Sequence, residues 1–368
     1  MDTKKKQQLS PMDLPTELLR GILLRLPVKS VFRFKCVSKQ WLSLLSDSHF
    51  AKSHFDLTNN INNKLLYLSR DLSGDYSNAY RVKIAGTSIH HDFRVHLHAI
   101  CKHESTRIIG SCRGFILLKN DTMLILWNPV TDLYTAVAYP DLDFWNLDFP
   151  CSSFFCGGVG YEKSTDDYLI VIGSIKAMLK PWWKFFSLRT NSWKEIEGGD
   201  RFFPCFPLHR QLGLVYNEAI HWLAIHTGSD DEHSFVIVAF DIPTKTLSMI
   251  PLPYPQDTRN CELSLMGGGG CFGMWIMNNT APEIWVMKEY KVESSWTKLN
   301  IVLPLYRGVI PLCFADSGDE VVCRRGNNRE LMKLSNNQAW GRCVLNPCDN
   351  DPILVMFTES LLSLPSSK

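Results

Sequence analysis

Histidines gather in residues 90–103, the part of the chain richest in side chains that bind metal ions. On a β-strand, His96 and His98 would share one face, with Arg94 beside them. Zinc requires three or four converging ligands held by further hydrogen bonds. The spacing of these histidines matches no known site, and Arg94 on the same face would repel a cation. We therefore expect no metal site and no cofactor.

Glycines at positions 268, 270 and 273 match the G-x-G-x-x-G pattern of dinucleotide-binding proteins. That pattern binds pyrophosphate where a strand leads into a helix, because the helix N-terminus holds the anion. Here residues 274–277, Met-Trp-Ile-Met, favour another strand. The glycines therefore predict a tight turn or a close approach of two strands.

Two acidic clusters, one at Asp141, Asp143 and Asp148 and the other at residues 230–232, could serve a glycosidase. Such an enzyme needs its carboxylates at a defined separation across a cleft, whereas both clusters have turn-like surroundings that favour solvated loops. The chain contains no G-x-S-x-G, P-loop or H-E-x-x-H motif. We expect a protein that is not an enzyme, and an enzyme acting on a glycan is the distant alternative.

Composition narrows the class of protein. Hydrophobic residues make up 45% and charged residues 21%, which is typical of a globular chain. A net charge of +2 gives no sign of nucleic-acid binding, and no apolar run reaches the length that spans a bilayer. The 12 cysteines form no C-x-x-C pair, and the polar N-terminus is no secretory signal. We expect reduced thiols, a location in the cytoplasm or nucleus, and neither nucleic acid nor membrane as a partner.

Residues 14–45, LPTELLRGILLRLPVKSVFRFKCVSKQWLSLL, predict three short helices. Pro15 is tolerated in a first turn and Pro27 ends the first helix, while Ser30 and Ser38 can cap the second and third. Apolar residues recur at helical spacing, and so small a unit cannot bury all of them. Part of this apolar surface should therefore belong to a partner protein.

The same stretch resembles a plant F-box over nearly every position of that motif, although Gly21 and Val31 stand where Glu and Leu are commoner. An F-box docks a substrate receptor onto the adaptor Skp1 of a cullin-based ubiquitin ligase. The other interpretation is a helical hairpin packed on its own domain. The resemblance implies that the following residues contact Skp1 or support the contact: Leu14, Pro15, Leu18, Ile22, Leu23, Leu26, Pro27, Val28, Phe34, Val37 and Trp41.

After Phe50 the pattern changes to short apolar runs that alternate with turns. Similar units recur at intervals of about 45–60 residues, as in kelch-like propeller blades, and predict a β-propeller of about six blades. A pair of β-sandwiches is the alternative. Large aromatic side chains occupy equivalent points of the units and are expected to be scaffold rather than site. They are Trp127, Trp193, Trp222, Trp285 and Trp296.

This region resembles the F-box-associated domain of plant F-box proteins. The similarity lies in residues 110–116, 126–131, 158–161, 167–168, 219–224 and 284–290, with Ser295 and Trp296. Arg113 replaces the usual Asn of a Ser-Cys-Asn-Gly turn, and Lys291 replaces a Gly; we expect both changes to affect turn geometry alone. Beyond Pro304 the similarity is looser.

The predicted fold class is α+β, with a three-helix F-box followed by an all-β, propeller-like domain. We expect a flexible tail at 1–10, the F-box at 11–50, and a connector with the first β elements at 51–107. The propeller-like domain should span 108–357, and a C-terminal tail 358–368.

Two loops add aromatic residues that the repeat does not need, and loops on a rigid scaffold commonly carry recognition. The alternative is that these rings fold back against the blades. The candidate target-binding residues are Phe144, Trp145, Phe149, Trp182 and Trp183.

Together the two resemblances imply the substrate-recognition subunit of an SCF-type (Skp1–cullin–F-box) ubiquitin ligase. Its partners would be a Skp1-like adaptor, through it a cullin, and an unidentified target protein. A non-catalytic interaction scaffold without coupling to a ligase is the alternative.

Overall fold

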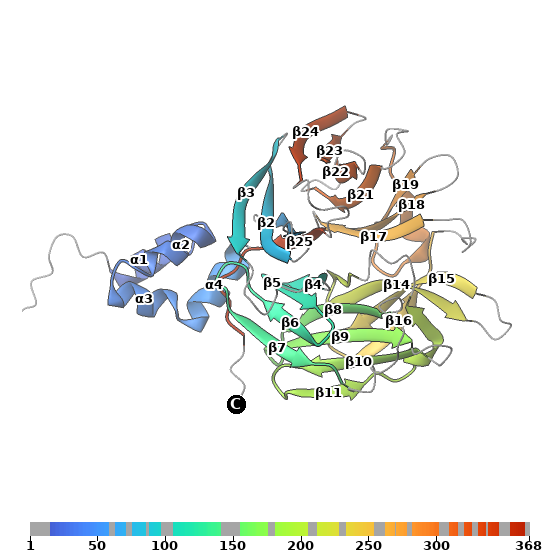
Figure 1. Ribbon diagram of the computed structural model, residues 1–368, viewed down its shortest axis with the longest axis horizontal. Coiled ribbons are helices and arrows are strands. Elements are labelled where there is room, and N and C mark those ends of the chain that lie inside the picture. The colour runs from blue at the N-terminus through green and yellow to red at the C-terminus, as the bar shows by residue number, and fades with distance from the viewer. Residues whose placement is uncertain are drawn as a thin grey trace, which may run out of the picture.

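A computed structural model describes residues 15–58, 63–70, 76–85, 88–96, 106–140, 155–175, 181–204, 212–227, 233–253, 262–268, 270–277, 282–301, 309–315, 320–325, 330–335, 338–345 and 354–364. In these residues a helical module lies beside a ring of β-sheets (Figure 1). The expected α+β class, with helices first and a β-propeller after them, is confirmed. The expected tail at 1–10 lies outside the described residues.

The helical module (residues 15–58) consists of α1 (Thr16–Leu23), α2 (Val28–Phe34), α3 (Lys39–Leu45) and α4 (Ser48–Thr58). Ser38 caps α3 as predicted, because its Oγ accepts a hydrogen bond from the Trp41 N–H at 3.2 Å. The prediction for Ser30 was wrong. Helix α2 already begins after Pro27, and Ser30 lies inside it, donating its N–H to the Pro27 carbonyl at 2.9 Å.

The fourth helix was not predicted, since the helical pattern was expected to end near Phe50. In α4 the buried residues Phe50, His54 and Phe55 share one face. The Asp47 carboxylate accepts a hydrogen bond from the Phe50 N–H at 2.9 Å. An Asp immediately before apolar residues at helical spacing was thus the signal in the sequence that could have revealed α4.

Six antiparallel sheets form the ring, as a propeller of about six blades requires. A β-sandwich pair is not what the structure shows. Blade 1 contains β25 (Leu354–Thr358), β1 (Asn63–Arg70), β2 (Tyr76–Ala85) and β3 (Ser88–His96). Blade 2 contains β4 (Arg107–Cys112), β5 (Phe115–Lys119), β6 (Met123–Trp127) and β7 (Tyr134–Ala138). Blade 3 contains β8 (Phe155–Glu162), β9 (Asp167–Ile175), β10 (Pro181–Ser187) and β11 (Ser192–Glu195). Blade 4 contains β12 (Phe202–Pro204), β13 (Leu214–Tyr216), β14 (Ala219–Thr227), β15 (His233–Asp241) and β16 (Thr246–Ile250). Blade 5 contains β17 (Glu262–Gly268), β18 (Cys271–Met277), β19 (Pro282–Met287) and β20 (Trp296–Lys298). Blade 6 contains β21 (Val309–Phe314), β22 (Glu320–Arg325), β23 (Glu330–Ser335) and β24 (Gln338–Val344). Short helices lie at η4 (Gly199–Arg201) and η5 (Glu293–Ser295).

The ring closes between the two ends of the domain, because β25 pairs with β1 in blade 1. Glu359, directly after β25, forms buried ion pairs with Lys64 at 2.5 Å and with Arg81. The segment 51–107, expected to hold a connector and the first β elements, contains most of α4 and the strands β1, β2 and β3 of blade 1. Leu361 and Leu362, in the expected C-terminal tail, are buried in a cluster shared with the helical module and blade 2.

Tryptophans join neighbouring blades, which supports their expected scaffold role. The indole N–H of Trp193 donates to the Ala138 carbonyl of blade 2, and that of Trp222 donates to the Gly157 carbonyl of blade 3, both at 3.0 Å. Trp296 likewise donates to the Pro251 carbonyl, which follows blade 4, at 3.1 Å. Trp127 is fully buried, whereas Trp285 packs half-buried against the core between blades 4 and 5.

Candidate functional site

Large apolar side chains are exposed on the helical module, where a folded protein ordinarily avoids clusters of them. Leu18 and Ile22, one helical turn apart on α1, have 58% and 50% of their surface exposed. Val37, between α2 and α3, is 60% exposed, and Pro15 and Pro27 are also at the surface. These five are among the residues predicted to contact Skp1, and Leu14 lies outside the described part of the chain.

The other predicted contact residues form a layer beneath this surface. Leu26, Phe34 and Trp41 are half-buried, and the Phe34 and Trp41 rings meet edge to face with their centroids 5.5 Å apart. Leu23 and Val28 are completely buried in the core of the module. These five therefore support the exposed residues, and Leu23 and Val28 can act only through packing.

Two further exposed residues were missed by the sequence analysis. Phe32 on α2 is 38% exposed and Leu42 on α3 is 47% exposed. Each belongs to a seven-residue helix that is apolar on more than one face. A helix that is apolar around much of its circumference cannot bury every face, and this pattern was the available signal.

The charge around this apolar surface is mostly positive. Between residues 15 and 45, Glu17 is the one acidic residue, and the basic residues are Arg20, Arg25, Lys29, Arg33, Lys35 and Lys39. The Lys35 ammonium lies 5.6 Å from the Phe32 ring centroid, and partial burial lowers the pKa of Lys35. These basic residues, here called the basic rim, lie in the same helices and turns as the exposed apolar side chains.

The candidate target-binding residues differ in how far they are buried. Trp183 is buried in β10, where its ring packs on Trp222 and its N–H donates to the Phe202 carbonyl at 3.0 Å. Trp183 therefore folds back against the blades, as the alternative interpretation expected. Because it is buried, it is not part of the exposed surface. Trp182 is half-buried beside Lys184, whose ammonium lies 5.8 Å from its ring centroid. Phe144, Trp145 and Phe149 lie outside the described residues.

Trp182 lies at the end of blade 3 away from the helical module. It pairs with Ser174, near the end of β9, whereas contact with α4 occurs at Asp166, immediately before β9 begins. Because the strands of each blade are antiparallel, the ends of β3, β7, β16, β20 and β24 lie on the same side as Trp182. The helical module and these strand ends therefore lie on opposite sides of the ring.

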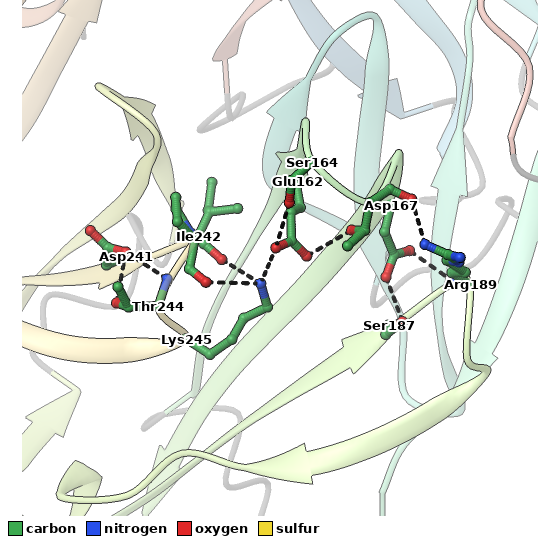
Figure 2. Close-up of polar contacts among 11 residues, drawn as sticks. Glu162, Ser164, Asp167, Ser187, Arg189, Asp241, Ile242, Thr244 and Lys245 are labelled. Atoms are coloured by element: carbon green, nitrogen blue, oxygen red, sulfur yellow. Dashed lines mark hydrogen bonds and ion pairs between the residues drawn. The ribbon is translucent and has the colours of Figure 1, made fainter.

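The polar side chains between blades 3 and 4 are engaged in structural contacts (Figure 2). Lys245 forms an ion pair with Glu162 at 2.8 Å and also donates to the Ile242 carbonyl at 2.6 Å. Burial alone would raise the pKa of Glu162, but hydrogen bonds from Lys245 and Thr165 outweigh it and lower that pKa. Asp167 accepts hydrogen bonds from the Ser187 hydroxyl and the Arg189 N–H. These carboxylates close turns and join blades.

The glycine pattern at residues 268–273 lies in a β-hairpin. Gly268 and Gly270 flank the turn between β17 and β18, so a strand follows the glycine pattern and the dinucleotide interpretation fails. In the described part of the chain, no three His, Cys, Asp or Glu side chains are placed to hold a metal ion. His96 ends β3, but its side chain, like His98 and both acidic clusters, lies outside the described residues.

Comparison with known proteins agrees with this architecture. Residues 12–53 match the F-box domain, and residues 72–361 match the F-box associated beta propeller domain. An F-box/kelch-repeat protein of Arabidopsis thaliana is 28% identical over 331 residues, covering 86% of each chain. The F-box protein CPR1 of the same plant is 26% identical, over 78% of this chain and 73% of its own.

The class of protein is therefore defined by two parts, a small helical module with an exposed apolar surface and a six-bladed propeller. This chain belongs to the family of F-box proteins with an F-box associated beta propeller domain, which includes the two plant proteins above. None of the described helices is long and apolar enough to cross a membrane.

Proposed function

We propose that this chain is the substrate-recognition subunit of an SCF-type ubiquitin ligase. In this proposal the F-box binds a Skp1-like adaptor, and through it a cullin, while the propeller binds a target protein. The exposed apolar surface of α1–α3 carries the proposal, because it lies within the F-box match and has a packed layer beneath it. The basic rim indicates acidic residues on the adaptor surface that contacts it.

The proposed mechanism is proximity. Holding a target lysine close to a charged E2 enzyme raises the effective concentration of the two reactants. This requires no acid, base or metal from the chain, which we propose is non-catalytic. The strand ends on the side of the ring opposite the F-box, together with Trp182, are proposed to contact the target. We place the complex in the cytoplasm or nucleus.

The test is co-purification with a Skp1-like adaptor, followed by measurement of the dissociation constant. Substituting Leu18→Ser and Ile22→Ser together should weaken binding at least tenfold, because both side chains are exposed and would lose apolar contact area. Leu133→Ser, at a residue that is 49% exposed in the propeller, is the matched control and should bind as the wild type does.

Absence of adaptor binding by a folded wild-type protein would overturn this proposal. Adaptor binding without association of a cullin would favour the alternative of an interaction scaffold without coupling to a ligase. Salt supplies a further check, because a basic rim that faces acidic residues predicts weaker binding as ionic strength rises.

A further inference from the structure

Helix α4 joins the F-box to the propeller at the turns β4–β5 and β8–β9. In Figure 1 this helix lies between the other helices and blade 2. The Lys52 ammonium forms an ion pair with Asp166 at 2.5 Å, and Phe55 is buried in a cluster with blade 2 residues such as Phe115. The contact is therefore made of an exposed ion pair at its edge and apolar packing inside.

Arg113 lies in the middle of this contact. Its guanidinium carbon is 4.5 Å from the ring centroid of Phe55 on α4 and 4.1 Å from that of Tyr161 at the end of β8. One cation thus contacts an aromatic ring of the F-box side and another of blade 3, while its own backbone belongs to blade 2. Such contacts are strongest where water is excluded.

The surroundings of Arg113 add a polar contact to the two rings, because its guanidinium also donates a hydrogen bond to the Tyr168 hydroxyl on β9 of blade 3. Its Nε is buried and has no hydrogen-bond partner among the described residues. The nearby Asp166 carboxylate interacts with the charge of Arg113, but its hydrogen bonds come from Lys52 and from the Tyr161 hydroxyl, which donates to it at 2.6 Å. Tyr161 thus presents its ring to Arg113, while its hydroxyl binds Asp166.

We propose that Arg113 is a positioning residue, whose guanidinium between Phe55 and Tyr161 fixes the orientation of the F-box relative to the propeller. Asn, the usual residue of the turn that this segment resembles, is too short to reach both rings. The change was expected to affect turn geometry alone, and the structure instead gives it a role between domains. The functional meaning rests on the proposed ligase role, because a fixed orientation sets where a bound target lies relative to the adaptor.

The test measures orientation directly and needs no target. Spin labels on encoded amino acids at residues 39 and 194, both exposed, would report the distance between α3 and β11 in the full chain. The wild type should give one narrow distance distribution. Arg113→Asn should broaden or shift it. The backbone at 113 has a φ of 49°, which Asn tolerates better than most residues, so the turn should be kept.

Further variants separate this role from general stability. Phe55→Leu keeps an apolar side chain but removes the ring, and should broaden the distribution as Arg113→Asn does. Tyr161→Phe keeps the ring and should leave it narrow. Lys291→Asn makes the same kind of change at a turn of blade 5 with a φ of 63°, and should match the wild type.

A narrow, unshifted distribution in both Arg113→Asn and Phe55→Leu would overturn the inference. Broadening in Tyr161→Phe equal to that in Arg113→Asn would also contradict it, because the Asp166 contact would then set the orientation. Adaptor affinity of Arg113→Asn should equal that of the wild type, and its loss would argue against a purely positional role. Failure of the wild type to bind the adaptor would overturn the proposed function and leave the distance result standing.

Discussion

Burial of single side chains determines their chemistry in this protein, and His221 is an instructive case. Its Nδ1 lies 3.1 Å from the Leu214 carbonyl and its Nε2 lies 2.7 Å from the Tyr290 hydroxyl. A carbonyl only accepts, so Nδ1 carries the proton and Nε2 accepts from Tyr290. Burial lowers the pKa of His221 to about 4, although the Leu214 carbonyl opposes the shift. The residue is a neutral structural group between blades 4 and 5.

This protonation state predicts a pH dependence of stability. The unfolded chain binds a proton at His221 near its ordinary pKa of about 6.5, whereas the folded chain does so only near 4. The stabilisation is therefore complete above about pH 6.5 and is lost as the pH falls towards 4. At about 1.4 kcal/mol per pKa unit, the loss should be about 3 kcal/mol.

Thermal unfolding at several pH values checks this prediction. His221→Gln should reduce the loss of stability between pH 6.5 and pH 4, while His226→Gln, at a half-buried position on the same strand, should leave it intact. An unchanged pH profile in His221→Gln would contradict the assignment. His54, whose pKa is also lowered by burial, contributes in the same direction.

At the scale of elements, glycines allow strands of different blades to approach closely. The Gly213 N–H donates to the Ile109 carbonyl of β4 at 3.0 Å and to the Gly157 carbonyl of β8 at 2.8 Å. A Cβ atom at position 213 would lie 2.7 Å from the Gly158 Cα and 2.8 Å from the Gly157 oxygen. The Ile220 side chain lies equally close, at 2.8 Å, so three blades approach one another here with no room for a side chain at position 213.

We expect Gly213→Ala to lower the free energy of unfolding by about 1–3 kcal/mol, since the added methyl group must displace backbone. Gly21→Ala is the matched control, because position 21 is a helix interior whose Cβ would be 3.6 Å from the nearest side-chain atom. That variant should gain about 0.5–1 kcal/mol. Calorimetry of both variants checks the opposite signs, and a stable Gly213→Ala would show that the blades can separate at little cost.

For the whole molecule, closure of the ring depends on the C-terminal strand and the ion pairs behind it. Glu359 is bound by Lys64 and Arg81, and all three side chains are almost completely excluded from water. Removing one member of a buried ion pair leaves charge without its counterion in a medium of low dielectric constant.

Glu359→Gln should therefore destabilise the fold by about 3–5 kcal/mol. Glu195→Gln removes a carboxylate that is 83% exposed and lies 3.7 Å from Lys184, and should change stability by less than about 1 kcal/mol. Denaturant unfolding checks both values. A Glu359→Gln protein as stable as the wild type would show that strand pairing alone closes the ring.

Much of the fold could be predicted from local patterns. The prolines at 15 and 27 and the cap at Ser38 placed the first helices, and the recurring apolar runs predicted a propeller of about six blades. The exposed residues Leu18, Ile22 and Val37 were predicted because they belong to a motif that is contiguous in the chain. Helix α4 was missed, although Asp47 and the spacing of Phe50, His54 and Phe55 indicated it.

The sequence by itself determined the class of most elements and the family, because periodicity, turn residues and a contiguous motif are local properties of the chain. The tertiary structure decided which residues meet across long separations: β25 with β1, Glu359 with Arg81, and Arg113 with Phe55 and Tyr161. It also decided that Trp183 is buried while Leu18 is exposed. Two apolar residues look alike in a sequence, and only the packing of neighbouring blades or helices determines which of them is covered.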